Sequence, residues 1–179
     1  MQNENSLEYF VAKELDNGIP IVLSMISEGH PFGDNKYAEE LKQRAQDLLA
    51  KGPAPLDKTE INRNRYAITD LIDDIPARNE YELLGTLAVL HQRLGDFYLR
   101  SNGQWSGNRK ALHRAIKKYN PDFAQKYGDA FEAAFKQNNF FQLERLVGKI
   151  LLPFGGRLVV SEKDYASDKA NQPKSNTGK

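Results

Sequence analysis

Between residues 36 and 152, apolar side chains recur every three to four positions, broken only by short segments rich in Gly, Pro and Asn. This spacing puts the apolar side chains on one face of a helix, so it predicts a succession of amphipathic helices. The expected helices span about 36–51, 57–74, 79–100, 109–118, 121–136 and 140–152. Short breaks between such helices favour antiparallel neighbours. The expected fold class is therefore mainly α, an antiparallel bundle of about six helices.

The segment before this region follows a different pattern. Two apolar runs, at 8–15 and 19–26, flank Asp16-Asn17-Gly18. Asn-Gly supplies the positive φ angles of a tight turn, so a β-hairpin is predicted in front of the bundle. The second run is apolar almost throughout, which indicates a strand buried on both faces and in need of further strands. The expected organisation is a hairpin at 1–33, a helical bundle domain at 34–160 and a disordered polar tail at 161–179.

Composition excludes several classes of function. The chain has no cysteine, which rules out disulfides and thiolate metal sites, and its three histidines (His30, His91 and His113) form no ligand pair at helical spacing. A net charge of +1 argues against a nucleic-acid partner, although five cations gather at 109–118. The polar N-terminus and the short apolar runs predict no membrane contact and a cytoplasmic location.

The loop before the fourth predicted helix is the first candidate site. It contains Trp105, the only tryptophan, and runs into Arg109 and Lys110 at a helix N-terminus. Backbone amides and the helix dipole favour an anion there, and two cations would strengthen the attraction, so a phosphate contact is one interpretation. The alternative is a surface loop in which Trp105 anchors the core and both cations are solvated.

Three aspartates and two histidines are further candidates. Asp70, Asp73 and Asp74 share one helix face, which suits a cationic substrate or a metal, or else a solvated face paired with nearby arginines. His91 and His113 lie beside apolar stripes and are either general bases or hydrogen-bonded packing residues.

Three sequence blocks in this order carry a family resemblance: Gly52-Pro53 with the helix at 65–74, then 103–107 running into Arg109-Lys110, then Gly155-Gly156. In these blocks the chain resembles the C-terminal helical domain of bacterial nucleotidyltransferase-domain proteins, relatives of the aminoglycoside adenylyltransferases. The resemblance implies ATP or another NTP with Mg²⁺ as cofactor. It also implies that Lys110 and Arg109 touch the triphosphate, and that Asp70, Asp73 and Asp74 face a small polar acceptor.

The family's catalytic motifs are absent from the sequence. It contains no Gly-Ser dipeptide and no Asp-x-Asp, so no catalytic residue and no metal ligand is assigned. By the resemblance, the hairpin is the remnant of a catalytic α/β domain. Either that domain lies in an upstream segment, or the chain is a relative that binds without catalysis.

Two functions are consistent with these features of the sequence. The first is a nucleotidyltransferase-like helical module that binds substrate and nucleotide for transfer of a nucleotide monophosphate to a hydroxyl. The second is a helical protein-interaction module similar to the partners in toxin–antitoxin systems. Its partner would complete the N-terminal sheet, or it would form a homo-oligomer.

Overall fold

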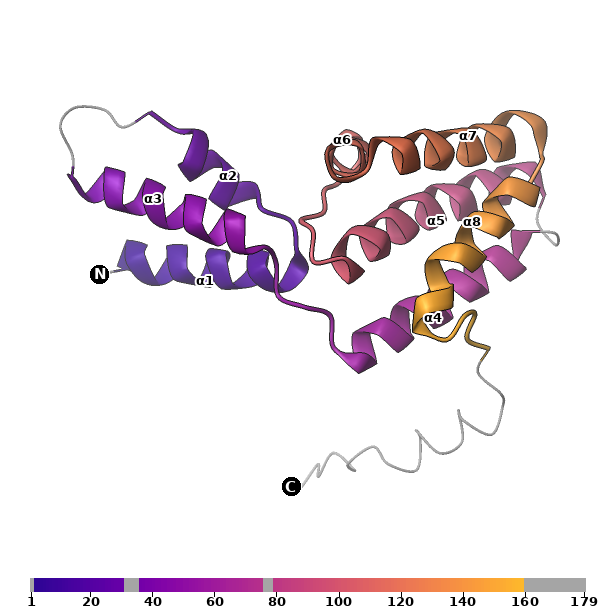
Figure 1. Ribbon diagram of the computed structural model, residues 1–179, viewed down its shortest axis with the longest axis horizontal. Coiled ribbons are helices and arrows are strands. Elements are labelled where there is room, and N and C mark those ends of the chain that lie inside the picture. The colour runs from indigo at the N-terminus through magenta and orange to yellow at the C-terminus, as the bar shows by residue number, and fades with distance from the viewer. Residues whose placement is uncertain (1, 31–35, 76–78, 160–179) are drawn as a thin grey trace, which may run out of the picture.

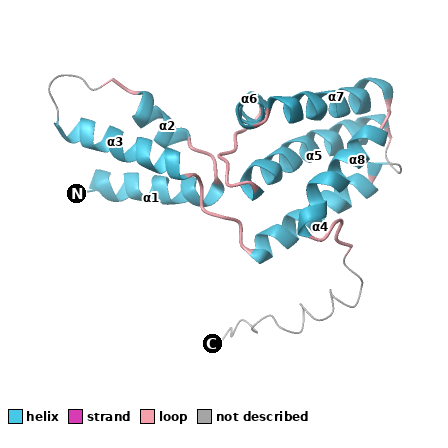
Figure 2. Ribbon diagram, viewed as in Figure 1, coloured by secondary structure: helices cyan, strands magenta, loops and turns pink. Residues whose placement is uncertain are grey.

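The computed structural model describes residues 2–30, 36–75 and 79–159, and every regular element in these ranges is a helix (Figures 1 and 2). The elements in chain order are α1 (Gln2–Asn17), α2 (Ile21–Glu28), α3 (Lys36–Lys51), α4 (Lys58–Asp73), α5 (Glu80–Ser101), α6 (Lys110–Tyr119), α7 (Pro121–Gln137), α8 (Phe141–Leu151) and the 3₁₀ turn η2 (Leu152–Phe154). The mainly α class predicted from the sequence is confirmed.

The predicted β-hairpin is wrong, because its two apolar runs form α1 and α2. Leu7, Val11 and Leu15 recur every four residues and pack into one apolar cluster, as the face of a helix does. Gly18 does adopt a positive φ of 70°, but it ends a helix, and its amide donates to the Glu14 carbonyl at 2.8 Å. No strand occurs in the described ranges, so a partner that completes an N-terminal sheet would find no edge strand there.

A side chain from α1 caps the N-terminus of α2. The Glu14 carboxylate accepts hydrogen bonds from the amides of Val22 and Leu23, the second at 3.0 Å. Glu14 is 8% exposed, and its negative charge lies at the positive end of the α2 dipole. This contact explains why an almost continuously apolar run, with Leu23 buried, forms a short helix instead of a strand.

The six helices predicted after residue 36 are present, with ends within two residues of the expected ones. Side-chain caps fix three of the starts. Asp57 and Asn79 each form a reciprocal capping box at the starts of α4 and α5. Asn120 accepts from the Phe123 amide at 3.0 Å and begins α7.

The six helices do not share a single core. Helices α4 to α8 enclose the larger cluster of buried side chains, in which α5 contributes Leu87, Leu90, Leu94 and Phe97. Helix α3 instead packs with α1 and α2 around a smaller cluster of Val11, Leu23 and Ala45. Figure 1 shows the corresponding division, with α1–α3 on one side and α4–α8 on the other.

Residues of both parts meet where α5 ends. The side chain of Arg100, 5% exposed, lies against Gly18 and donates to the Ala54 carbonyl at 3.1 Å. The Ser106 amide donates to the Gly18 carbonyl at 2.7 Å. These contacts tie the turn between α1 and α2 to the end of α5 and the loop that follows it.

The tail predicted at 161–179 lies outside the described residues. Within the described ranges, no helix combines the length and the apolar character that crossing a bilayer requires.

Candidate functional site

The loop before α6, which is the first candidate site, is fixed to α5 by one amide side chain. The Gln92 Nε2 atom donates to the Gly107 carbonyl at 2.9 Å, and the Arg109 amide donates to Gln92 Oε1 at 3.1 Å. Both ends of the Gln92 amide are therefore used to hold the loop. Arg109 adopts a positive φ of 54°, which is uncommon for a residue with a side chain.

Trp105 anchors this loop to the N-terminal helices. Its indole Nε1 donates to the Leu49 carbonyl at 2.8 Å, and its ring packs on the smaller cluster. The geometry thus agrees with the alternative that assigned Trp105 a packing role, and Trp105 does not line the hollow formed by the loop and α5.

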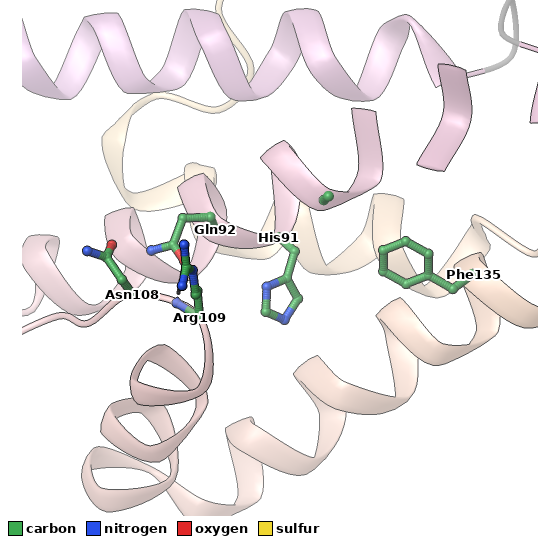
Figure 3. Close-up of a pocket in the computed structure, with 6 residues that line it drawn as sticks. His91, Gln92, Asn108, Arg109 and Phe135 are labelled. Atoms are coloured by element: carbon green, nitrogen blue, oxygen red, sulfur yellow. Dashed lines mark hydrogen bonds between the residues drawn. The ribbon is translucent and has the colours of Figure 1, made fainter. Parts of the chain in front are cut away.

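That hollow opens between α5, the start of α6 and the end of α7, and encloses about 890 Å³. It will be called the α5–α7 hollow, and its lining residues are Ala88, His91, Gln92, Asn108, Arg109 and Phe135. Figure 3 shows His91 between Phe135 and the polar group of Gln92, Asn108 and Arg109. One wall is thus aromatic, and the other carries a guanidinium and amides.

The start of α6 offers fewer free amides than a bare helix N-terminus. The Ala111 amide donates to the Asn108 carbonyl at 3.0 Å, and the Leu112 amide donates to the Arg109 carbonyl at 3.2 Å. Lys110 is exposed and lies outside the lining of the α5–α7 hollow. Of the two predicted phosphate contacts, the structure therefore places Arg109 at the hollow and Lys110 beside it.

His91 is half-buried and in contact with other rings. It packs edge-on against Tyr127 and Phe131, with ring centroids 5.1 and 4.8 Å away. Burial lowers the pKa of His91, and the nearby His113 lowers it further. The neutral imidazole that results can accept a proton, so both sequence interpretations of His91, packing residue and base, stay compatible with its position.

The three aspartates lie elsewhere. Asp73 forms an ion pair with Arg157 at 2.9 Å, and the Asp74 amide donates to the Asp70 carbonyl at the end of α4. Figure 1 shows this end of α4 far from the start of α6. The structure does not bring the aspartates and Arg109 into one site.

Four lining residues, Ala88, Gln92, Asn108 and Phe135, were given no role from the sequence. They lie on α5, in the loop before α6, and on α7, and only packing of these elements brings them together. No local signal distinguished Gln92, because His91 and Arg93 are also polar residues between the buried Leu90 and Leu94.

The described residues offer no ligand set for the Mg²⁺ that the resemblance implies. No group of three or more His, Asp or Glu side chains in the described ranges is arranged to hold a metal ion.

No protein-family model, curated protein or solved structure matches the chain.

Proposed function

We propose that the chain is a nucleotidyltransferase-like helical module that binds a nucleotide in the α5–α7 hollow. The observation that carries the proposal is the placement of Arg109 opposite two rings, His91 and Phe135, around one open space. A guanidinium suits phosphate oxygens, and aromatic rings suit a nucleobase. Asn108 is exposed at the hollow and adds an amide for hydrogen bonding.

Contacts among the blocks that carry the family resemblance support the same proposal. The Arg65 Nε atom donates to the Gly156 carbonyl at 2.9 Å, which ties the first block to the third. Gly52, at a φ of 87°, approaches the Gly103 carbonyl so closely that a Cβ on Gly52 would lie 2.9 Å from it. These contacts join α4 to the C-terminal segment, and the linker between α3 and α4 to the loop that leads to Arg109.

The proposal covers binding and not the transfer step. Moving a nucleotide monophosphate to a hydroxyl requires groups that stabilise the charge on the triphosphate, usually carboxylate-held metal ions. The sequence lacks the corresponding motifs. We propose a cytoplasmic location, as expected from the sequence.

The test is a thermal shift with Mg-ATP and Mg-GTP. A ligand at 100 times its Kd stabilises the native state by about 2.7 kcal/mol, and each kcal/mol raises the Tm of a chain of this size by about 2–4 °C. We expect Arg109→Ala to abolish the shift and Arg63→Ala, which removes an exposed cation on α4, to preserve it. Lys110→Ala should weaken the shift less than Arg109→Ala does. The absence of a shift with either nucleotide in the native chain would end the proposal.

A second candidate function, a protein-interaction module, is favoured by a neighbouring groove, which shares Ala88, Gln92 and Asn108 with the α5–α7 hollow. It encloses about 960 Å³ between α1, α2 and α5, and its walls include the exposed apolar side chains Phe10, Ile21 and Val89. Exposed apolar surface of this kind is common where proteins associate. Sedimentation at increasing concentration tests self-association, which Ile21→Glu should reduce, whereas Tyr37→Glu, a change at an exposed tyrosine on α3, should leave it unchanged.

A further inference from the structure

Helix α6 concentrates the positive charge of the chain. Residues 109–119 contain five of the 25 Lys and Arg residues and none of the 24 Asp and Glu residues. The rest of the chain therefore has 20 cations against 24 carboxylates. The net charge of +1 argued against a nucleic-acid partner, but it is the sum of a strongly basic segment and a weakly acidic remainder.

The cations of α6 form a row on its exposed face. Leu112 and Ile116 are fully buried and fix the inward face, so Lys110, Arg114 and Lys117 lie along the opposite side, with Lys118 beside them. These four exposed residues will be called the basic strip. At a rise of 1.5 Å per residue, Lys110 and Arg114 are about 6 Å apart along the helix.

The basic strip is not neutralised by the protein. In the described part of the chain, no carboxylate forms an ion pair with any of its four side chains. Glu28 of α2 lines the same hollow as Lys118, but no ion pair joins them. Like charges three and four residues apart destabilise a helix, and a cation in the first turn opposes the helix dipole. A bound polyanion would relieve both costs.

The neighbourhood of the strip distinguishes between two kinds of polyanion. An acidic protein partner would require an interface whose centre is poor in charge and rich in apolar side chains. The exposed face of α6 has instead a row of cations, and the ring of Tyr119, seven residues after the buried Leu112, lies at the end of the helix on its inward side, against Tyr98. Protein–nucleic-acid interfaces are polar and strongly positive, as this face is.

The exposed ring of Tyr119 favours a single-stranded nucleic acid over a duplex. Its ring is 41% exposed, and its hydroxyl donates to Asn102 Oδ1 at 3.3 Å, which holds the ring in place beside Lys118. Proteins that bind single strands combine a basic track for the backbone with aromatic rings on which unpaired bases stack. From these observations we propose that α6 binds the phosphodiester backbone of a single-stranded nucleic acid along the basic strip, with a base stacked on Tyr119.

The test compares three forms of the full chain by fluorescence anisotropy over a series of KCl concentrations. The strip variant is Arg114→Gln/Lys117→Gln/Lys118→Gln. The control variant, Lys51→Gln/Lys58→Gln/Lys149→Gln, changes the charge equally at exposed positions on α3, α4 and α8. The probes are a labelled single-stranded RNA, single-stranded DNA and duplex DNA of the same sequence, with polyglutamate as a non-nucleic polyanion.

We expect the native chain to bind both single strands more tightly than the duplex or polyglutamate. Each phosphate contact with a single strand contributes about 0.7 to the slope of log K against log salt, so the strip variant should lose about 2 units of slope. The control variant should keep the native slope. Tighter binding of RNA than of DNA would assign the strand to RNA, and equal binding would assign recognition to the shared backbone.

Three results would overturn the proposal: no binding at low salt, equal losses in the strip and control variants, or binding of duplex or polyglutamate as tight as that of single strands. Far-UV circular dichroism of both variants checks that the fold is kept. Tyr119→Leu, which removes only the ring, should weaken binding of single strands without changing the salt slope. The strip variant retains Arg109, so its response to Mg-ATP reports on the α5–α7 hollow independently.

Discussion

Arg100 and Gly18 lie in direct contact: a Cβ built on Gly18 would be 2.2 Å from Arg100 Cδ and 2.5 Å from Arg100 Nε. The two residues are far apart in the sequence. Gly18 lies between helices that pack around the smaller apolar cluster, and Arg100 lies on α5, which contributes to the larger one. Their contact shows that the turn after α1 is shaped to receive a side chain from the end of α5.

Gly18→Ala should therefore destabilise the protein. The new methyl group would overlap Arg100, and alanine disfavours the positive φ of this position, so we expect a loss of about 2–4 kcal/mol. Urea unfolding measures the loss. Gly85→Ala is the matched control, because Gly85 is exposed in α5 and a Cβ there would meet nothing within 4 Å. That substitution should stabilise by roughly 0.5–1 kcal/mol.

Replacement of Glu14 should weaken α2. Glu14→Gln keeps the shape of the side chain but removes the charge at the start of the helix and one of the two acceptor oxygens. We expect a loss of about 1–2 kcal/mol, measured by urea unfolding. Asp16→Asn, an exposed position nearby, is the control. Equal stabilities of Glu14→Gln and the native chain would mean that the carboxylate does not cap α2.

Trp105→Phe tests the anchor of the loop. Phenylalanine retains most of the apolar contact but leaves the Leu49 carbonyl without its indole donor. An unmet acceptor of this kind costs about 1–3 kcal/mol. Because the variant has no tryptophan, unfolding should be followed by far-UV circular dichroism. A loss of stability with an unchanged response to Mg-ATP would confirm that Trp105 supports the loop without touching a ligand.

The stability of the protein should fall as the pH drops below the usual pKa of histidine. The folded state holds the pKa of His91 below 6.5, so the unfolded chain binds the proton first and acid favours unfolding. The effect begins near pH 6.5 and ends once the pH is below the pKa of the folded state. His91→Phe should flatten the dependence in this window, as measured by urea unfolding at a series of pH values. His30→Gln, at an exposed histidine, should leave the dependence unchanged.

The sequence predicted the later helices well, and three of them, α4, α5 and α7, carry their own start signals. Asp57, Asn79 and Asn120 act as caps in the folded chain as they do in isolated helices. The N-terminal helices were missed because Asn17-Gly18 ends a helix as readily as it turns a hairpin. The four-residue spacing of Leu7, Val11 and Leu15 was the overlooked signal.

The candidate site was predicted only in part, for a different reason. Arg109 and His91 could be named because each is chemically conspicuous within its own segment. Gln92 and Phe135 join them through the packing of α7 on α5, which no local pattern encodes. The acidic end of α4 was assigned to the same site through the resemblance. In the structure, Asp73 instead forms an ion pair with Arg157 of the C-terminal segment.

The unequal size of the two apolar clusters has a consequence for how the protein opens. Of the described residues, only Val11, Leu23 and Ala45 are buried in the cluster of α1 to α3, whereas every helix from α4 to α8 contributes to the other cluster. Amide protons in α1 to α3 should therefore exchange with solvent through partial openings, at lower free energy than amides in α5 or α7. We therefore expect two cooperative units, and we expect a protease to cleave α1 to α3 while α4 to α8 are still folded.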